Sequence, residues 1–229
     1  MKRIAIVSTL MLCSLAGLAQ QKEQDRIKES GLVLKDIVEM PDKGIPHDLL
    51  DKSACVIVFP SVKKAAFVVG GSYGRGVITC RTGSNYAGPW SAPAMFALEG
   101  ASFGFQIGGQ ATDFVLLVMN DKGARSVMSS KVKLGADASA AAGPVGRNAS
   151  AETDVVLKAE ILSWSRAQGL FAGISLSGST LRSDDGANKA LYGKDLSAQD
   201  IVFGGKVKAP ASARGLLGEL NKVTPHHKQ

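Results

Sequence analysis

The sequence predicts a single α+β domain, built mostly from an antiparallel, curved or barrel-like sheet with flanking helices at both ends. Between residues 55 and 120, short runs rich in β-branched and aromatic residues alternate with Gly, Pro and Asn, which is typical of an antiparallel sheet. Apolar residues recur at helical spacing before this region and again near the end of the chain. The 229 residues are enough to bury one hydrophobic core.

Residues 1–19 have the composition of a secretory signal peptide. A basic start is followed by an apolar run over residues 4–12, and the small residues Gly17 and Ala19 fit cleavage after Ala19. Cys13 follows Leu-Met-Leu instead of the small residues of a lipobox, so we expect no lipid anchor. The sequence therefore predicts export to the periplasm or cell envelope.

Residues 20–44 are expected to contain an amphipathic helix over Lys22–Met40. Ile27 and Leu34 recur at helical spacing, and Pro41 ends the pattern. Four basic residues lie mostly on the other faces of this helix: Lys22, Arg26, Lys28 and Lys35. The apolar face would either enter a membrane interface or pack on the sheet of its own domain, and the sequence leaves both alternatives open.

The domain itself is expected over residues 45–223, and residues 224–229 form a polar tail. A short helix is expected from Pro46, which suits a first helical turn. The expected strands that follow are Cys55–Phe59, Ala65–Tyr73, Gly76–Arg81, Trp90–Leu98, Ser102–Gln110 and Phe114–Asn120. Gly100, Gly104 and Gly108 would form a packing groove on a helix, but glycine disfavours soluble helices, so we interpret this run as a strand.

The second half of the domain mixes both kinds of element. A helix is expected over Asp121–Ser130, and strands over Asp154–Trp164 and Leu170–Leu181. Three further helices are expected toward the end of the chain: Ala187–Tyr192, Ala198–Phe203 and Ser212–Val223. Helices thus bracket the strand-rich part on both sides.

Two cysteines remain after signal cleavage, and each lies in a predicted strand. If these strands are neighbours, Cys55 and Cys80 can form a disulfide, which export permits. Closing that loop would stabilise the fold by about 3 kcal/mol. If the strands are not neighbours, the two residues are separate buried thiols that behave as small hydrophobes. The sequence does not establish which strands are adjacent.

Motifs for catalysis are missing from the sequence. His47 has no partner at a recognisable spacing, and the other histidines, His226 and His227, lie in the tail. Gly70–Gly74 matches a Gly-x-Ser-x-Gly nucleophile elbow around Ser72, but the residues that follow predict a strand instead of the helix that this motif requires. We therefore expect a protein that is not an enzyme, with no cofactor and no metal ion.

The charge balance favours an anionic surface as partner. Removing Lys2 and Arg3 from the 27 basic residues leaves 25, against 20 acidic ones. Lys63 and Lys64 are expected to protrude from a turn between two strands, where they could hold a lipid phosphate. No helix-turn-helix, zinc-finger or RNA-recognition signature is present, so we expect no nucleic-acid partner.

A series of short sequence motifs resembles a known domain family. In order, they are Ile45-Pro46, Trp90-Ser91-Ala92-Pro93, Thr112-Asp113-Phe114-Val115, Ala142-Gly143-Pro144-Val145-Gly146-Arg147-Asn148 and Gly169-Leu170-Phe171-Ala172-Gly173. Together they resemble the SYLF domain family across nearly the whole mature chain. The resemblance implies a non-enzymatic domain that binds membrane lipids and, in eukaryotic members, actin. It maps the family's lipid contacts loosely onto the basic residues of the first helix.

We therefore expect a non-catalytic protein that associates with anionic phospholipid surfaces. Its candidate contact residues are Lys22, Arg26, Lys28, Lys35, Lys63 and Lys64. The alternative is an envelope protein-interaction scaffold without specific lipid binding. We do not expect actin as a partner, because an exported protein would not meet it inside its own cell.

Overall fold

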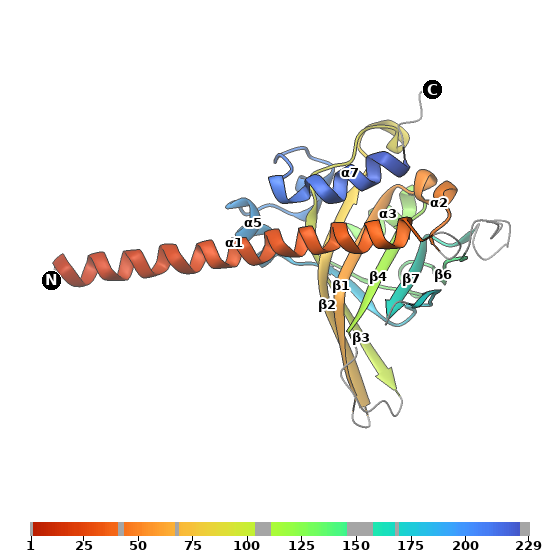
Figure 1. Cartoon of the computed structure of the whole chain (residues 1–229), viewed down its shortest axis with the longest axis horizontal. Helices are drawn as coiled ribbons and strands as arrows, with labels where there is room; N and C mark the ends of the chain where they lie inside the picture. Colours follow the sequence, from red (N-terminus) through yellow and green to blue (C-terminus); the bar gives the residue numbers. More distant parts are fainter. Residues whose placement is uncertain are drawn as a thin grey trace.

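The structure is a computed structural model that describes residues 2–40, 44–66, 69–103, 111–145, 158–167 and 170–224 of the chain (Figure 1). Its helices are α1 (Lys2–Val38), α2 (His47–Lys52), η1 (Ser84–Tyr86), α3 (Asp121–Val127), α5 (Asp185–Tyr192), α6 (Ala198–Val202), η2 (Ala211–Ala213) and α7 (Arg214–Val223). Its strands are β1 (Cys55–Ala66), β2 (Val69–Cys80), β3 (Ala94–Phe103), β4 (Ala111–Val118), β5 (Lys131–Lys133), β6 (Ala140–Ala142), β7 (Ile161–Ala167), β8 (Leu170–Gly173) and β9 (Thr180–Ser183).

All the strands of the described residues join one sheet, in the order β5-β9-β3-β2-β1-β4-β7-β6, with β8 also paired to β7. Every pair is antiparallel except β6 with β7. The sheet is strongly curved, and helices from both ends of the chain pack on it (Figure 1). The predicted α+β class, with a curved antiparallel sheet and flanking helices, is therefore confirmed.

Helix α1 packs on its own domain. Ile27, Leu34 and Ile37 are fully buried in a cluster that includes Val58 and Val77 from the sheet. The helix also contacts α5 and α7, so the apolar stripe predicted from the sequence faces the core. Of the two alternatives for this helix, the structure shows packing on the sheet. Its N-terminal half extends away from the domain (Figure 1).

The opposite face of the sheet carries a second core. Fully or nearly fully buried residues such as Ile57, Phe96 and Phe114 point into it. Helices α3 and α6 cover this side through residues that include Val127 and Ile201. Alternate residues of the central strands therefore enter different cores, because side chains alternate between the two faces of a strand.

Two predicted strand breaks are wrong, since β1 and β2 are each continuous. Pro60 lies at a bulge in β1, where the pairing register shifts between Phe59 and Val62 and Ser61 has a φ of 54°. A bulge accommodates proline because the ladder there needs no N–H donor. Gly74 lies inside β2, where an added Cβ would come within 2.4 Å of the Val62 side chain.

Other boundaries also differ from the prediction. The expected strand Trp90–Leu98 begins at Ala94 as β3, and Leu170–Leu181 divides into β8 and β9 around a turn at Gly178. Most of the expected strand Ser102–Gln110, and residues 154–157 of another, lie outside the described residues. The three late helices agree with α5, α6 and α7 to within two residues at each end.

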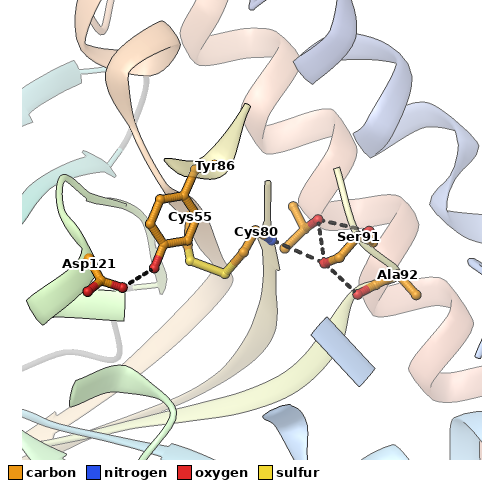
Figure 2. Close-up of a disulfide and its surroundings, with 7 residues drawn as sticks. Cys55, Cys80, Tyr86, Ser91, Ala92 and Asp121 are labelled. Carbon is orange, nitrogen blue, oxygen red and sulfur yellow. Dashed lines mark hydrogen bonds between the residues drawn. A yellow bond between two sulfur atoms is a disulfide. The ribbon is translucent and has the colours of Figure 1, made fainter. Parts of the chain in front are cut away.

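The cysteines form a disulfide. Cys55 and Cys80 lie directly opposite each other in the β1–β2 pair, and both are fully buried (Figure 2). The register of these two strands therefore decides between the two alternatives that the sequence left open.

The glycine-rich phrases have structural roles where they are described. An added Cβ on Gly143 would lie 2.0 Å from the Trp164 ring, so only glycine allows this close approach. The same indole donates a hydrogen bond to the Pro144 carbonyl at 2.9 Å. Asp113 accepts hydrogen bonds from Arg166 at 2.9 and 3.0 Å, which joins β4 to β7.

Candidate functional site

The three lysines predicted on the first helix lie on the outer side of α1. Lys22, Lys28 and Lys35 are exposed, and Lys28 pairs with Asp25 at 3.0 Å. The same outer side also carries acidic residues, namely Asp25, Glu29, Asp36 and Glu39. This surface therefore has no excess of positive charge. Among the described residues, no helix is both long enough and apolar enough to cross a membrane.

Arg26 lies apart from these lysines, in an ion-pair chain beneath the helix. Its guanidinium contacts Glu23, and Glu23 also meets Arg75 of β2 at 3.4 Å. Arg75 pairs in turn with Asp184, the N-cap of α5, at 2.6 Å. Burial lowers the pKa of Arg75, but its acidic partners outweigh this effect, so the pKa is raised. Arg26 thus helps to fasten α1 to the sheet, and its side chain is only 12% exposed.

Lys63 and Lys64 lie within strand β1, so their predicted placement in a turn is wrong. They pair with Tyr73 and Ser72 of β2 beyond the bulge. Lys63 is exposed, whereas the side chain of Lys64 lies outside the described part of the structure. Lys63 pairs with Tyr73, which lies an even number of residues along β2 from Arg75 and Val77, so Lys63 is on the face of the sheet that α1 covers. Strands β1, β2 and β3 continue past the helix (Figure 1).

The register places Lys63 in a row that crosses five strands. Lys133 of β5 pairs with Thr180 of β9, which pairs with Glu99 of β3. Glu99 pairs with Tyr73 of β2, and Tyr73 pairs with Lys63 of β1. Directly opposed residues point to the same side of a sheet, so all five side chains share one face.

A second row runs beside the first. Lys131 of β5 pairs with Arg182 of β9, and Arg182 forms an ion pair with Glu99 at 2.7 Å. That hydrogen bond to Glu99 outweighs partial burial and raises the pKa of Arg182. We call the resulting surface the basic sheet face, and define it by Lys63, Tyr73, Lys131, Lys133 and Arg182.

Three of the cations on this face are available to a partner. The ammonium groups of Lys63, Lys131 and Lys133 have no acidic partner within the described ranges, and all three residues are exposed. Tyr73 between them is 46% exposed, which places an amphipathic ring in the same surface. Lys131 and Lys133 face outward because Val132 between them is buried in the core.

The sequence reasoning found Lys63 and missed the other members of the face. A Lys-Val-Lys alternation is the local signal of a strand with one charged side, so Lys131 and Lys133 could have been predicted from the sequence. The pairing of β5 with β9 and of β9 with β3 could not have been predicted, because it joins segments far apart in the chain.

Two hollows flank the short helix η1 between β2 and β3. Asn85 and Tyr86 line both, and both residues have positive φ angles, 53° and 59°. Tyr86 donates a hydrogen bond to Asp121 at 2.8 Å, close to the Cys55–Cys80 disulfide (Figure 2). Burial, followed by this hydrogen bond and the charge of Asp121, raises the pKa of Tyr86 to about 12.

The larger hollow, of about 890 Å³, lies between η1, α3 and α6 and includes Met128 and Phe203. The smaller one, of about 440 Å³, lies at the end of α2 and includes Arg81 and Lys52. In the part of the chain that the structure describes, no three His, Cys, Asp or Glu residues are grouped to hold a metal ion. Ser72 lies inside β2, where its hydroxyl contacts the Gly100 carbonyl at 3.4 Å.

Comparison with known proteins gives one consistent result. Residues 99–223 match the family model Ysc84, described as Las17-binding protein actin regulator. The SH3 domain-containing YSC84-like protein 1 of Rattus norvegicus is 34% identical over 203 residues, which cover 86% of this chain and 58% of the relative. Protein YSC84 of Saccharomyces cerevisiae is 34% identical over 200 residues, which cover 83% of this chain and 41% of the relative.

The chain spans about half the length of the curated relatives that it matches. The family model covers more than half of this chain, and the aligned region of the relatives includes most of it. The order of glycine-rich phrases noted in the sequence is thus explained: the chain belongs to the Ysc84 family, whose domain is the SYLF domain.

Proposed function

We propose that this protein is a non-catalytic, exported domain that associates with anionic phospholipid surfaces through its basic sheet face. The observation that carries the proposal is the row of opposed residues that brings Lys63, Tyr73 and Lys133 onto one face. Lysines near an anionic bilayer each contribute about 1 kcal/mol of attraction. The exposed Tyr73 ring supplies the amphipathic group that suits a membrane–water interface.

The structure leads us to assign lipid contact to different residues from those predicted on the first helix. The apolar stripe of α1 around Ile27, Leu34 and Ile37 is already buried against the domain, so this stripe is not free to insert into a membrane. The outer side of α1 mixes lysines with carboxylates, whereas the basic sheet face carries four cations against Glu99. We therefore assign lipid contact to the sheet, and from the residues first predicted we retain Lys63.

Export to the periplasm or cell envelope belongs to the same proposal. The signal-like composition of residues 1–19 supports it, and the Cys55–Cys80 disulfide is compatible with an oxidising compartment. Leu18 is 68% exposed, whereas the Gln20 side chain donates a hydrogen bond to the Leu191 carbonyl of α5. Intact mass measurement on protein recovered from the envelope should give a chain that starts at Gln20; a mass that retains residues 1–19 contradicts the cleavage.

The rat relative is named as an SH3 domain-containing protein, and the family model is described as Las17-binding protein actin regulator. An exported protein would not meet actin in its own cell, so we propose a lipid surface as its partner.

Co-sedimentation with lipid vesicles tests the proposal. Protein starting at Gln20 should pellet with phosphatidylcholine vesicles in proportion to the phosphatidylglycerol that they contain. Added salt should release it, because surface charges are screened. Protein that stays in the supernatant with anionic vesicles at low salt would exclude lipid association.

The alternative, an envelope protein-interaction scaffold, is supported by a different surface. The larger hollow presents Tyr86, Met128 and Phe203, and Phe203 is 38% exposed. Aromatic residues and methionine are enriched in protein–protein contacts. Photo-cross-linking from position 203 in cells would favour this alternative if it captured one defined envelope protein while vesicle binding was absent.

A further inference from the structure

The smaller hollow contains a buried cation that uses few of its hydrogen-bond donors. Arg81, at the end of the strand pair β1–β2, has a side chain that is only 4% exposed. Its Nη2 donates to the Thr224 carbonyl at 3.1 Å and reaches Asp51 at 3.5 Å. Its Nε is buried and has no hydrogen-bond acceptor among the described residues. The guanidinium lies over the Trp90 ring, 4.9 Å from the centroid.

The other arginines that join elements of the fold are paired more closely. Arg75 meets Asp184 at 2.6 Å, Arg166 meets Asp113 at 2.9 Å, and Arg182 meets Glu99 at 2.7 Å. The pKa of each of these three is raised by its partners. Burial instead lowers the pKa of Arg81, and the charge of Asp51 compensates too little. Arg81 is thus the least neutralised member of this set.

The surroundings of Arg81 fit an incoming anion. The hollow of about 440 Å³ is lined by Arg81 and by the exposed Lys52, against the single carboxylate of Asp51. Asn85, Ser53 and Ala54 also line the hollow. A guanidinium presents a planar set of donors that matches the oxygens of an oxyanion, and an ammonium adds a mobile point charge.

We propose that this hollow binds the oxyanion group of a small ligand, with Arg81 and Lys52 as the charged donors. The site lies at the C-terminal end of α2 and is separate from the basic sheet face, so it does not depend on the lipid proposal. Its charged lining residues are Arg81, Lys52 and Asp51, a balance that favours an anionic ligand.

Nuclear magnetic resonance with inorganic phosphate as the probe tests the site. Titrating phosphate against chloride at matched ionic strength should shift the Arg81 Nε–H resonance in a saturable way. Lys52→Gln should raise the dissociation constant for phosphate about tenfold, which is the usual effect of losing one charge-assisted hydrogen bond. Lys35→Gln, which removes an exposed lysine from α1, is the matched control and should leave the constant unchanged.

Lys52 is exposed, so its variant tests the site without disturbing the buried Arg81. An Arg81 resonance that does not respond to phosphate, or equal weakening by Lys52→Gln and Lys35→Gln, would overturn the proposal.

A second measurement identifies the source of the oxyanion. If Lys52→Gln weakens phosphate binding but keeps wild-type affinity for anionic vesicles, the site takes a free soluble ligand. If it weakens both, the site takes a lipid headgroup. If neither the wild-type protein nor the variant binds vesicles while the wild-type protein binds phosphate, the lipid proposal is wrong and the oxyanion site is supported.

Discussion

Replacing the three exposed lysines of the basic sheet face should abolish most of the affinity for anionic membranes. The change is Lys63→Gln, Lys131→Gln and Lys133→Gln in one chain. Neighbouring strands are about 4.8 Å apart, so Lys63 and Lys133 are separated by about 19 Å across the face. Lys131 and Lys133 lie about 7 Å apart along one strand. All three therefore lie close together on the same face of the sheet.

The expected loss follows from these positions. Each lysine near an anionic surface contributes about 1 kcal/mol, so the triple variant should lose about 3 kcal/mol, or roughly a hundredfold in vesicle affinity. The three residues are exposed and have no acidic partner within the described residues, so folding stability should change by less than about 0.5 kcal/mol each.

The matched control removes the same charge elsewhere. Lys22→Gln, Lys28→Gln and Lys35→Gln together lower the net charge by the same amount on the outer side of α1. Co-sedimentation with phosphatidylglycerol vesicles compares the two variants, and thermal unfolding confirms that both are folded. Equal losses in both variants would show that net charge alone attracts the protein, and the assignment to the sheet would fail. A larger loss in the α1 variant would move the contact to that helix.

Three further predictions concern the fold. Replacing Cys55 and Cys80 by alanine should lower the free energy of unfolding in urea by about 3 kcal/mol, since the bridge closes a loop of 25 residues; an unchanged midpoint would refute the stabilising role. Gly143→Ala should destabilise by about 1–3 kcal/mol because its methyl group meets the Trp164 ring, and full stability would show that this contact relaxes freely. Tyr86 should ionise near pH 12 in an absorbance titration, and Tyr86→Phe should remove that step; because its folded pKa is raised, its contribution to stability is present below about pH 10 and is lost as the pH rises to about 12.

Local pattern predicted much of this fold. The apolar spacing of Ile27 and Leu34 indicated α1, and the late helices were placed to within two residues. These signals are accessible because helix and strand periods repeat over a few residues. The predicted breaks at Pro60 and Gly74 were wrong because bulges and close contacts across the sheet tolerate both residues inside strands.

The candidate site was much less predictable. Basic residues on a helix are visible as a pattern, but whether Glu23 neutralises Arg26 or Asp25 neutralises Lys28 depends on how the helix packs. Arg81 gave no signal, since its missing acceptor is a property of its buried surroundings. The sequence shows where charged residues occur, and packing decides whether each charge is already neutralised by an ion pair within the fold.

By itself, the sequence determined the class of the fold, the amphipathic first helix and the family phrases, because each depends on residues close together in the chain. Only the tertiary structure decided that α1 packs on the sheet, that Cys55 bonds to Cys80, and that Lys63 joins Lys133 on one face. Each of these follows from strand register or helix packing between distant segments, which a local pattern does not specify. The basic sheet face exists because β5 and β9 return to pair beside β3.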